Sequence, residues 1–279
     1  MDHRFRAFSF VDRITSLEPG ASIRGRYTIP PTVDAFPASL VAEAVGQLAA
    51  WAAMATVDFS HRPVAGIAGT IELLSVVKPG QVVDLAAEME AVDTDAAGYC
   101  GTAQVDGRPV VRLRDCVGPM VPVEEFDDPD AVRERCRLLC ADGVAPGGFP
   151  GLPPLTLECG KCEGGRLAQA VLRVPPAAPL FADHFPRRPV FPGTLVMHAN
   201  LETAAMLARE AHGDHGAPWV ARTISEVKLR SFIPPGATLN LEARQIGCSN
   251  GNLTVAVESR VGQRLVCSAE ILFSPEVNP

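Results

Sequence analysis

Several features are missing from this sequence of 279 residues, and each absence argues against a class of protein. Residues 1–6 carry no apolar core of a secretory signal, so we expect an intracellular, cytoplasmic protein. No Gly-rich motif that cradles a nucleotide phosphate occurs, which argues against a nucleotide-dependent reaction. Basic residues (25) are fewer than acidic ones (32), and the net charge of −7 argues against a nucleic-acid partner.

A long apolar run without polar interruptions is also absent. The longest apolar segment, residues 38–57, contains Glu43 and Gln47 and is rich in alanine. A membrane span tolerates such residues poorly, so the segment predicts a helix buried in a globular core, and we expect no membrane partner.

The eight cysteines have one spacing that could indicate zinc. Cys136 and Cys140 precede Cys159 and Cys162, which together read as CxxxC followed by CxxC. The first pair lies inside a predicted helix, and the second pair lacks the glycine usual in a zinc knuckle. We therefore expect free thiols and no metal site.

The chain contains an internal duplication. Three segments recur at offsets of 156, 155 and 155 residues: 75–80 as 231–236, 106–111 as 261–266, and 37–40 as 192–195. Each half predicts a short strand region, then one long apolar helix (about 37–57 and 192–212), then several strands. A helix that is apolar nearly all round has to be buried, so each half predicts a sheet around one helix.

A separate segment joins the two halves. Asp128 suits an N-cap, Pro129 suits the first helical position, and Gly143 suits the end of a short helix. The Pro- and Gly-rich residues 144–154 then predict an exposed linker. We expect three parts: an N-terminal unit (1–125), a linker with a short helix (126–153) and a C-terminal unit (154–279).

The most informative stretch runs from Asp183 to Leu195. It reads D-H-F-P-R-R-P-V-F-P-G-T-L. It closely resembles the active-site loop of the hotdog-fold β-hydroxyacyl-(acyl carrier protein) dehydratases, H-F-P-x-x-P-x-x-P-G-x-L. The resemblance implies an α+β double hotdog: two tandem hotdog units, each a long buried helix wrapped by an antiparallel sheet.

The two halves resemble complementary parts of the family's active site. In the family an acid stands fourteen residues after the histidine, but here that position is His198. The N-terminal helix reads L-V-A-E-A-V-G-Q from Leu40, similar to the family's L-x-x-E-A-M-A-Q, with Glu43 at the acid position. The N-terminal half is ten residues shorter where the C-terminal half carries the His184 loop. One site therefore keeps both members of the pair and its mirror site keeps neither.

In the resembling dimers each site takes its histidine from one subunit and its acid from the other. The resemblance therefore implies that His184 faces Glu43 across the junction of the halves, with His184 as base and Glu43 as acid. A carboxylic acid that an apolar pocket keeps protonated suits the second task. Gln47 lies one helical turn from Glu43 and is expected to orient it. The Gly193 N–H is expected to stabilise charge on the thioester oxygen.

The substrate is expected to arrive on a phosphopantetheine arm, with no other cofactor. Five basic residues are expected to meet an acidic carrier protein or a cofactor phosphate: Arg187, Arg188, Arg222, Lys228 and Arg230. These residues also suit a solvated surface. We expect a monomeric pseudo-dimer, or a dimer of it.

The expected function is dehydration of a β-hydroxyacyl thioester, linked to acyl carrier protein or coenzyme A, in fatty-acid or polyketide-type synthesis. Two alternatives stay open, because one fold hosts many activities. One is another hotdog enzyme, a thioesterase or an enoyl isomerase. The other is a catalytically silent partner subunit.

Overall fold

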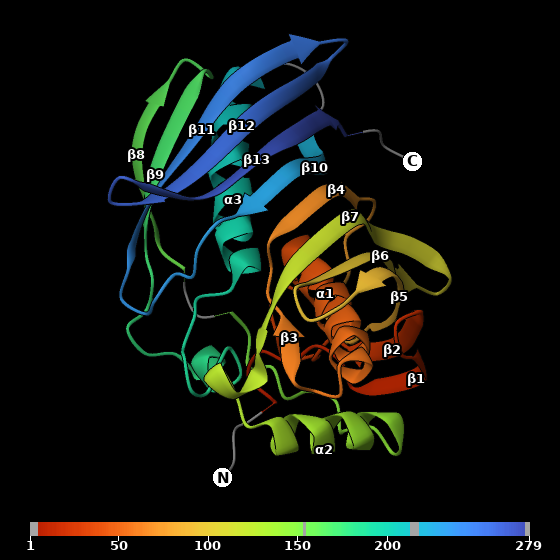
Figure 1. Cartoon of the computed structure of the whole chain (residues 1–279). Helices are drawn as coiled ribbons and strands as arrows, with labels where there is room; N and C mark the ends of the chain where they lie inside the picture. The colour runs from red at the N-terminus through yellow and green to blue at the C-terminus, as the bar shows by residue number, and fades with distance from the viewer. Residues whose placement is uncertain (1–4, 153–154, 213–217, 277–279) are drawn as a thin grey trace.

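The computed structural model describes residues 5–152, 155–212 and 218–276 (Figure 1). The N-terminal unit contains helix α1 (Ala38–Thr56) and strands β1 (Arg13–Glu18), β2 (Ser22–Thr28), β3 (His61–Pro63), β4 (Ile67–Leu73), β5 (Val82–Val92), β6 (Ala96–Val105) and β7 (Arg108–Pro122). The joining segment contains the 3-10 turn η1 (Val123–Glu125) and helix α2 (Pro129–Cys140). The C-terminal unit contains β8 (Leu157–Glu163), β9 (Leu167–Arg173), η2 (Pro179–Ala182), α3 (Gly193–His212), β10 (Trp219–Leu229), β11 (Thr238–Ser249), β12 (Asn252–Val261) and β13 (Arg264–Pro275).

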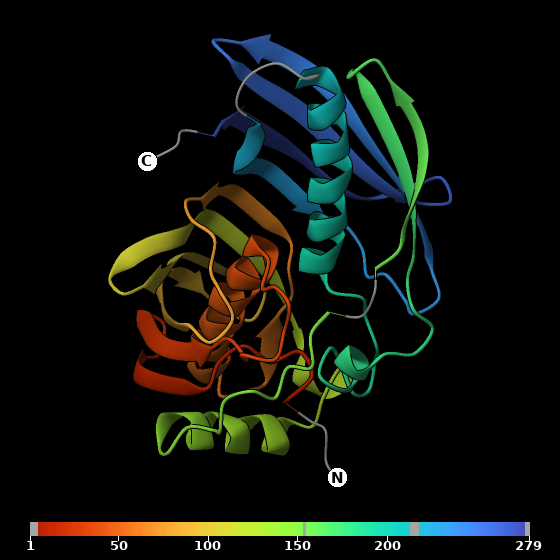
Figure 2. The same ribbon diagram turned by 180° about the vertical axis from the view of Figure 1, so that it is seen from behind.

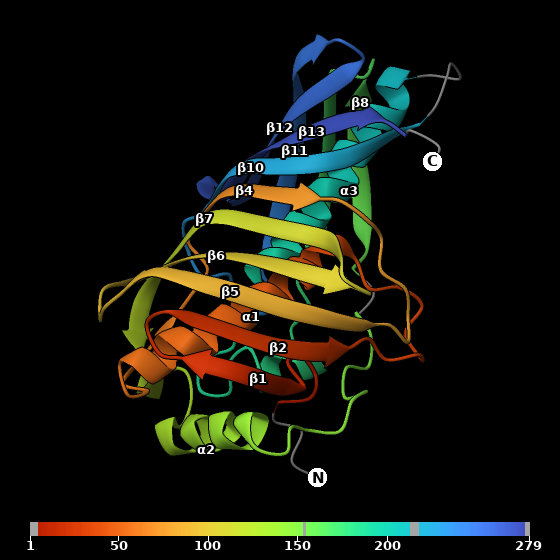
Figure 3. The ribbon, with the colours of Figure 1, turned by 90° about the vertical axis from the view of Figure 1, so that its right-hand side faces the viewer.

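One antiparallel sheet runs through both units. Its strand order is β1-β2-β5-β6-β7-β4-β10-β13-β12-β11-β9-β8, and β3 pairs with β7 off this path. The two units join where β4 pairs with β10, with Ile71 opposite Ile224 and Ala68 opposite Val227. Figure 3 shows the strands following one another across this junction. The two units therefore share one continuous sheet.

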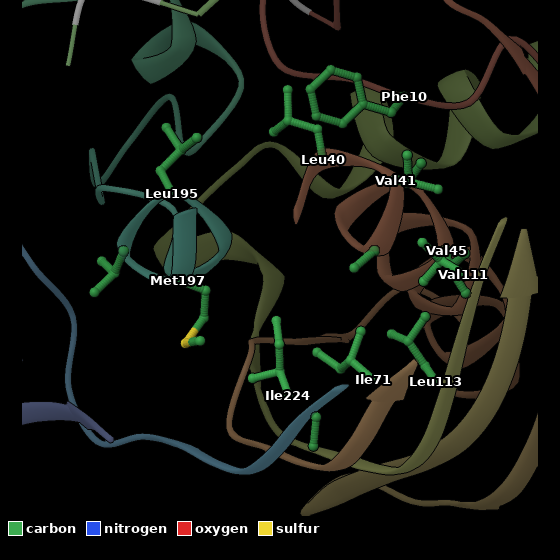
Figure 4. Packing of buried hydrophobic residues seen from close by; sticks show 14 of the residues in the cluster. Phe10, Leu40, Val41, Val45, Ile71, Val111, Leu113, Leu195, Met197 and Ile224 are labelled. Atoms are coloured by element: carbon green, nitrogen blue, oxygen red, sulfur yellow. The ribbon is translucent and has the colours of Figure 1, made fainter. Parts of the chain in front are cut away.

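The two long helices lie in the concave faces of the sheet (Figure 2). In α1, Leu40, Val45 and Leu48 are fully buried, and Leu195 and Leu207 are fully buried in α3. Burying such a side chain contributes about 1.5–3 kcal/mol, so these helices carry much of the core energy. Figure 4 shows this packing continuing from α1 to Met197 and Ile224 of the second unit. The architecture is a double hotdog.

By length and hydropathy, α1 is the one helix in the described part of the chain that could cross a membrane. In this structure, however, α1 packs against β2, β5 and β6, and about two-thirds of its most apolar 18-residue stretch is buried. This burial is typical of the core helix of a globular protein. The bounds of both long helices agree with the expected ones to within a residue.

The joining helix α2 forms as its cap residues predict. The Asp128 carboxylate accepts hydrogen bonds from the backbone N–H groups of Asp130 (3.0 Å) and Ala131 (3.3 Å), and Pro129 occupies the first turn. The helix ends at Cys140 rather than at Gly143. Gly143 takes a positive φ of 73° and donates to the Leu138 carbonyl, so it reverses the chain just after the last turn. The expected boundary at residues 153 and 154 lies outside the described residues.

The cysteines are free thiols. Cys136 and Cys140 lie on α2, whereas Cys159 and Cys162 lie on β8. These two elements are at opposite ends of the molecule in all three overall views (Figures 1–3). The two cysteine pairs therefore do not come together as a four-ligand site.

Candidate active site

A cavity of about 630 Å³ lies at the junction of the units. The N-terminal unit lines it with residues of α1, β3 and β4. The C-terminal unit lines it with the loop after η2, the first turn of α3 and the segment after β10. Its polar members include Glu43, Gln47, Arg62, His184, Gly193 and Thr194. Residues from both halves of the duplication are thus exposed to one shared space.

His184 is held by the loop that links η2 to α3. Its backbone N–H donates to the Leu180 carbonyl (2.9 Å), and its carbonyl accepts from the Val190 N–H (2.9 Å). The ring Nδ1 lies 2.8 Å from the Val190 carbonyl oxygen. A carbonyl oxygen can only accept, so Nδ1 carries the proton and Nε2 keeps a lone pair. The ring stacks on Phe185 with centroids 4.1 Å apart, and the peptide bond between these residues is cis.

Burial sets the charge state of His184. It lowers the pKa of His184 below 6.5, and the positive charge of Arg62 acts in the same direction. The negative charge of Glu43 and the hydrogen bond to Val190 raise it. The net lowering leaves the imidazole neutral at pH 7, which is the form that can accept a proton. Because the charge of Glu43 acts on His184, the two side chains are within electrostatic reach of each other across the two units.

Glu43 is held by one residue from each unit. The Gln47 amide nitrogen donates to Glu43 Oε1 (2.9 Å), and the Thr194 hydroxyl donates to Glu43 Oε2 (2.7 Å). Thr194 stands in the first turn of α3, so the second bond crosses the junction. The positive charge of Arg62 also acts on Glu43.

The Glu43 carboxyl group has polar neighbours besides the apolar helix that carries it. The neighbours of Glu43 on α1 are apolar, but its carboxylate meets Thr194 from α3 and Arg62 from β3. Neither lies near Glu43 in the sequence, so the pattern of the helix could not predict them. Thr194 donates to the carboxyl group, and Arg62 adds positive charge beside it.

Gln47 connects Glu43 to the N-terminal segment. Its side chain donates to the Phe8 carbonyl (3.0 Å) and accepts from the Phe10 N–H (2.8 Å). Its amide is thus held in one orientation, with a donor directed at Glu43. The expected orienting contact is present, and sequence reasoning did not predict the backbone segment that holds it.

Asp183 ties the same segment to the histidine loop. Its carboxylate accepts from the Phe5 N–H, from the Phe8 N–H (2.8 Å) and from the Ser9 hydroxyl (3.2 Å). Burial raises the pKa of Asp183, and these hydrogen bonds lower it. Sequence reasoning gave Asp183 no role, although it directly precedes His184. The segment from residue 5 to residue 10 therefore spans from α1 to the histidine loop (Figure 2).

Gly193 is the first residue of α3, where backbone N–H groups have no partner within the helix. It lines the cavity, so its N–H can receive an oxygen of a ligand. The structure adds a second reason for glycine. A Cβ at this position would lie 2.5 Å from Leu229 Cδ1, so a side chain would push against β10.

Known dehydratases are similar to this chain in sequence. The family model of the ApeI-like dehydratases matches residues 161–269. The 3-hydroxyacyl-[acyl-carrier-protein] dehydratase FabZ of Alkaliphilus metalliredigens is 30% identical over 117 residues, which are 42% of this chain and 79% of that protein. The FabZ of a Roseiflexus species is 32% identical over 112 residues, 40% of this chain and 78% of that protein. The chain belongs to the hotdog-fold dehydratase family.

Solved structures extend the likeness of this dehydratase-family chain to both units. A candidate oleoyl thioesterase from Lactobacillus plantarum has a TM-score of 0.61 at 11% identity and covers 95% of this chain and 99% of its own. An acyl-ACP thioesterase from Bacteroides thetaiotaomicron has a TM-score of 0.54 at 13% identity and covers 91% and 98%. At such identities these similarities show the double hotdog fold alone.

The two loop arginines of this family member are engaged within the protein. Arg187 donates to the Glu124 carbonyl (2.8 Å) and lies 3.9 Å from Asp128. Arg188 lies 3.5 Å from Glu125 and lines the cavity. Both tie the histidine loop to the joining segment, and their contact with a carrier stays a prediction.

Of the remaining basic residues, only some line the cavity. Arg230 lines the cavity and donates to Ser268 (2.9 Å), whereas Lys228 forms an ion pair of 3.1 Å with an acidic neighbour on its own strand. Lys228, Arg222 and Arg187 are not among the cavity residues. Arg264, which the sequence did not single out, also lines the cavity. Arg230 and Arg264 are thus better placed than Lys228 and Arg222 to meet a ligand.

His198 does not line the cavity. Burial lowers its pKa, and the charge of Glu202 one turn away raises it. Its position at the mirror of the composite site and its dispensability both stay predictions.

The cavity extends along one face of α1. Small residues at helical spacing form this wall: Ala42, Gly46, Ala49, Ala50 and Ala53. The facing wall includes Tyr99, Leu113 and Cys116. A Cβ at Gly46 would lie 3.2 Å from the Tyr99 hydroxyl, so glycine keeps this part open. An apolar chamber of this kind suits an alkyl chain.

One group of metal-ligand atoms occurs in the described part of the chain. Glu90, Cys100 and Asp115 place their ligand atoms within 4.8 Å of one another, and the Cys100 thiol donates to Glu90 (2.9 Å). Desolvation raises the pKa of Cys100, and Glu90 raises it further. The group does not line the cavity, so it has no part in the chemistry of that site.

Proposed function

We propose that this protein dehydrates a β-hydroxyacyl thioester to the trans-2-enoyl thioester in fatty-acid or polyketide-type synthesis. The substrate is carried by acyl carrier protein or coenzyme A, and the protein acts in the cytoplasm. The observation that carries the proposal is the shared cavity. His184 of the C-terminal unit and Glu43 of the N-terminal unit line it together, and His184 Nε2 has a free lone pair.

The chemistry assigns one proton transfer to each residue. His184 Nε2 takes the proton from C2, and the resulting enolate oxygen accepts the Gly193 N–H. The C3–O bond then breaks, Glu43 gives its proton to the departing hydroxyl, and water leaves with the enoyl thioester. The imidazolium and carboxylate formed in this step attract each other, and the proton returns from His184 to Glu43.

The polar neighbours of Glu43 support the second transfer. Thr194 and Gln47 donate to its two oxygens, and Arg62 adds positive charge. These interactions strengthen as the carboxylate forms, so they stabilise the transition state more than the ground state. The reaction is redox-neutral, and we propose that it uses no cofactor besides the phosphopantetheine that carries the acyl group.

The test is to follow both possible products on one substrate. β-Hydroxyacyl thioesters of several chain lengths, on coenzyme A and on carrier protein, are assayed for enoyl product and for free thiol. Enoyl formation that reverses when enoyl thioester is supplied supports the proposal. Thiol release without enoyl product assigns a thioesterase. A shift of the double bond in an added enoyl thioester, without dehydration, assigns an isomerase. No turnover across the panel assigns a silent partner.

A further inference from the structure

Arg62 on β3 is a half-buried cation in the cavity wall. Burial lowers the pKa of Arg62 to about 10, while the charges of Asp127 and Glu43 raise it. The guanidinium therefore stays positive at neutral pH. A charge that is partly removed from water is costly without a partner or a task, so its place in this cavity calls for a reason.

The guanidinium stacks on the residue next to the catalytic histidine. Its Cζ lies 3.8 Å from the centre of the Phe185 ring. The Phe185 ring also stacks on His184, with centroids 4.1 Å apart, and meets Phe126 edge-on at 5.3 Å. Arg62 belongs to the N-terminal unit and the two rings belong to the C-terminal unit. The stack therefore crosses the junction at the histidine loop.

The structural contacts do not use all of the donors of Arg62. Its Nε is buried and has no hydrogen-bond partner among the described residues. An apolar side chain of similar length would fill the space without leaving a donor unsatisfied. Packing alone thus favours another residue at this position.

We propose that Arg62 is a positioning residue of the composite site: its guanidinium stacks on Phe185 and so holds the His184 loop of the opposite unit, and it faces the Glu43 carboxylate of its own unit. The expected effect of Arg62 on turnover rests on the proposed function. Its expected effect on the pKa of His184 does not depend on which reaction the site performs.

The charges around His184 give the direction of a pH effect. Glu43 faces it from α1 and Arg62 from β3, and Asp127 after η1 acts on Arg62. On its own loop, Arg188 is paired with Glu125, and Asp183 is turned to the N-terminal segment, where Arg135 of α2 acts on it. Removal of the Arg62 charge leaves the carboxylates unopposed. The pKa of His184 should then rise, and the acidic limb of the rate profile should move to higher pH.

The experiment compares Arg62→Met and Arg62→Lys with a matched control, Arg133→Met. Arg133 also stacks on a phenylalanine, Phe59 (5.5 Å), and is ion-paired with Asp130, but it does not line the cavity. Each full-length variant is measured for turnover against pH and for thermal unfolding. The titration of His184 is followed by NMR of histidine-labelled protein, with the resonance assigned from His184→Ala.

Arg62→Met should raise the His184 midpoint. It should also lower kcat by about 10- to 100-fold, because a small misplacement of a reacting group has a cost of this order. Arg62→Lys should keep the midpoint near that of the wild type and recover part of kcat. Arg133→Met should change neither the midpoint nor kcat.

Two outcomes overturn the proposal. One is an unchanged His184 midpoint in folded Arg62→Met. The other is a kcat of Arg62→Lys that is as low as that of Arg62→Met. If Arg62→Met does not fold, Arg62→Lys decides through its kcat: a value equal to that of the wild type overturns the role of the guanidinium stack. If the wild type forms no enoyl product, the proposed reaction fails, but the midpoint comparison still tests Arg62.

Discussion

Replacement of Thr194 by valine tests the link between the two units most directly. The change keeps the shape of the side chain and removes the hydroxyl that donates to Glu43 Oε2 at 2.7 Å. A hydrogen bond to a charged group contributes about 1.5–3 kcal/mol. Thr194 and Glu43 are only half-buried, so water can replace part of this, and about 1–2 kcal/mol should be lost. If the bond forms fully only as Glu43 becomes a carboxylate, kcat should fall by about 5- to 30-fold.

The matched control is Thr194→Ser, which loses a methyl group and keeps the hydroxyl. Its kcat should stay within about twofold of the wild type, since the charge-assisted hydrogen bond is preserved. Enoyl formation is measured at saturating substrate, so that kcat is separated from KM. Thermal unfolding of both variants shows whether the fold is intact.

Two outcomes would refute the reasoning. Equal kcat values for the valine and serine variants would show that the hydroxyl does not support Glu43 in turnover. A fall in Tm for valine alone, with kcat unchanged in the folded protein, would make the bond a structural tie between the units.

Further predictions concern the catalytic pair, the chamber and the mirror position. His184→Ala and Glu43→Gln should each slow enoyl formation by about 10²–10⁴-fold with little change in Tm, and a smaller loss in either would contradict its assigned role. Gly46→Ala should lower kcat/KM for 3-hydroxydodecanoyl substrates by about tenfold and spare 3-hydroxybutyryl ones, since the new Cβ would lie 3.2 Å from the Tyr99 hydroxyl; an equal loss for both would exclude the chamber as the acyl site. Burial lowers the pKa of His198 below 6.5, so the unfolded chain binds the extra proton first and the free energy of unfolding should fall as pH drops below about 6.5. His198→Gln should keep turnover and weaken this pH dependence in denaturant titrations at pH 7.5 and 5.5; loss of turnover would place the working site at the mirror position.

The sequence alone determined the elements and their order. The repeated segments predicted a strand region, one long buried helix and several further strands in each half, and Asp128 with Pro129 predicted the start of α2. These features depend on residues close together in the chain, where periodicity and capping act locally. The duplication predicted the pairing of the units, and the dense motif around His184 predicted the family.

The tertiary structure alone decided the surroundings of the proposed catalytic pair, Glu43 and His184. Thr194 is 151 residues from Glu43, and Arg62 reaches Phe185 from the opposite unit. An isolated arginine or threonine carries no signal of its own in a sequence. The sheet register that joins β4 to β10 brings the units together and determines which side chains meet at their junction. The tertiary structure also decides that Arg187 donates to the joining segment and that Arg264 lines the cavity. Motifs identify residues that are common to a family, whereas the electrostatics of a site depend on every charge that folding brings within a few ångströms.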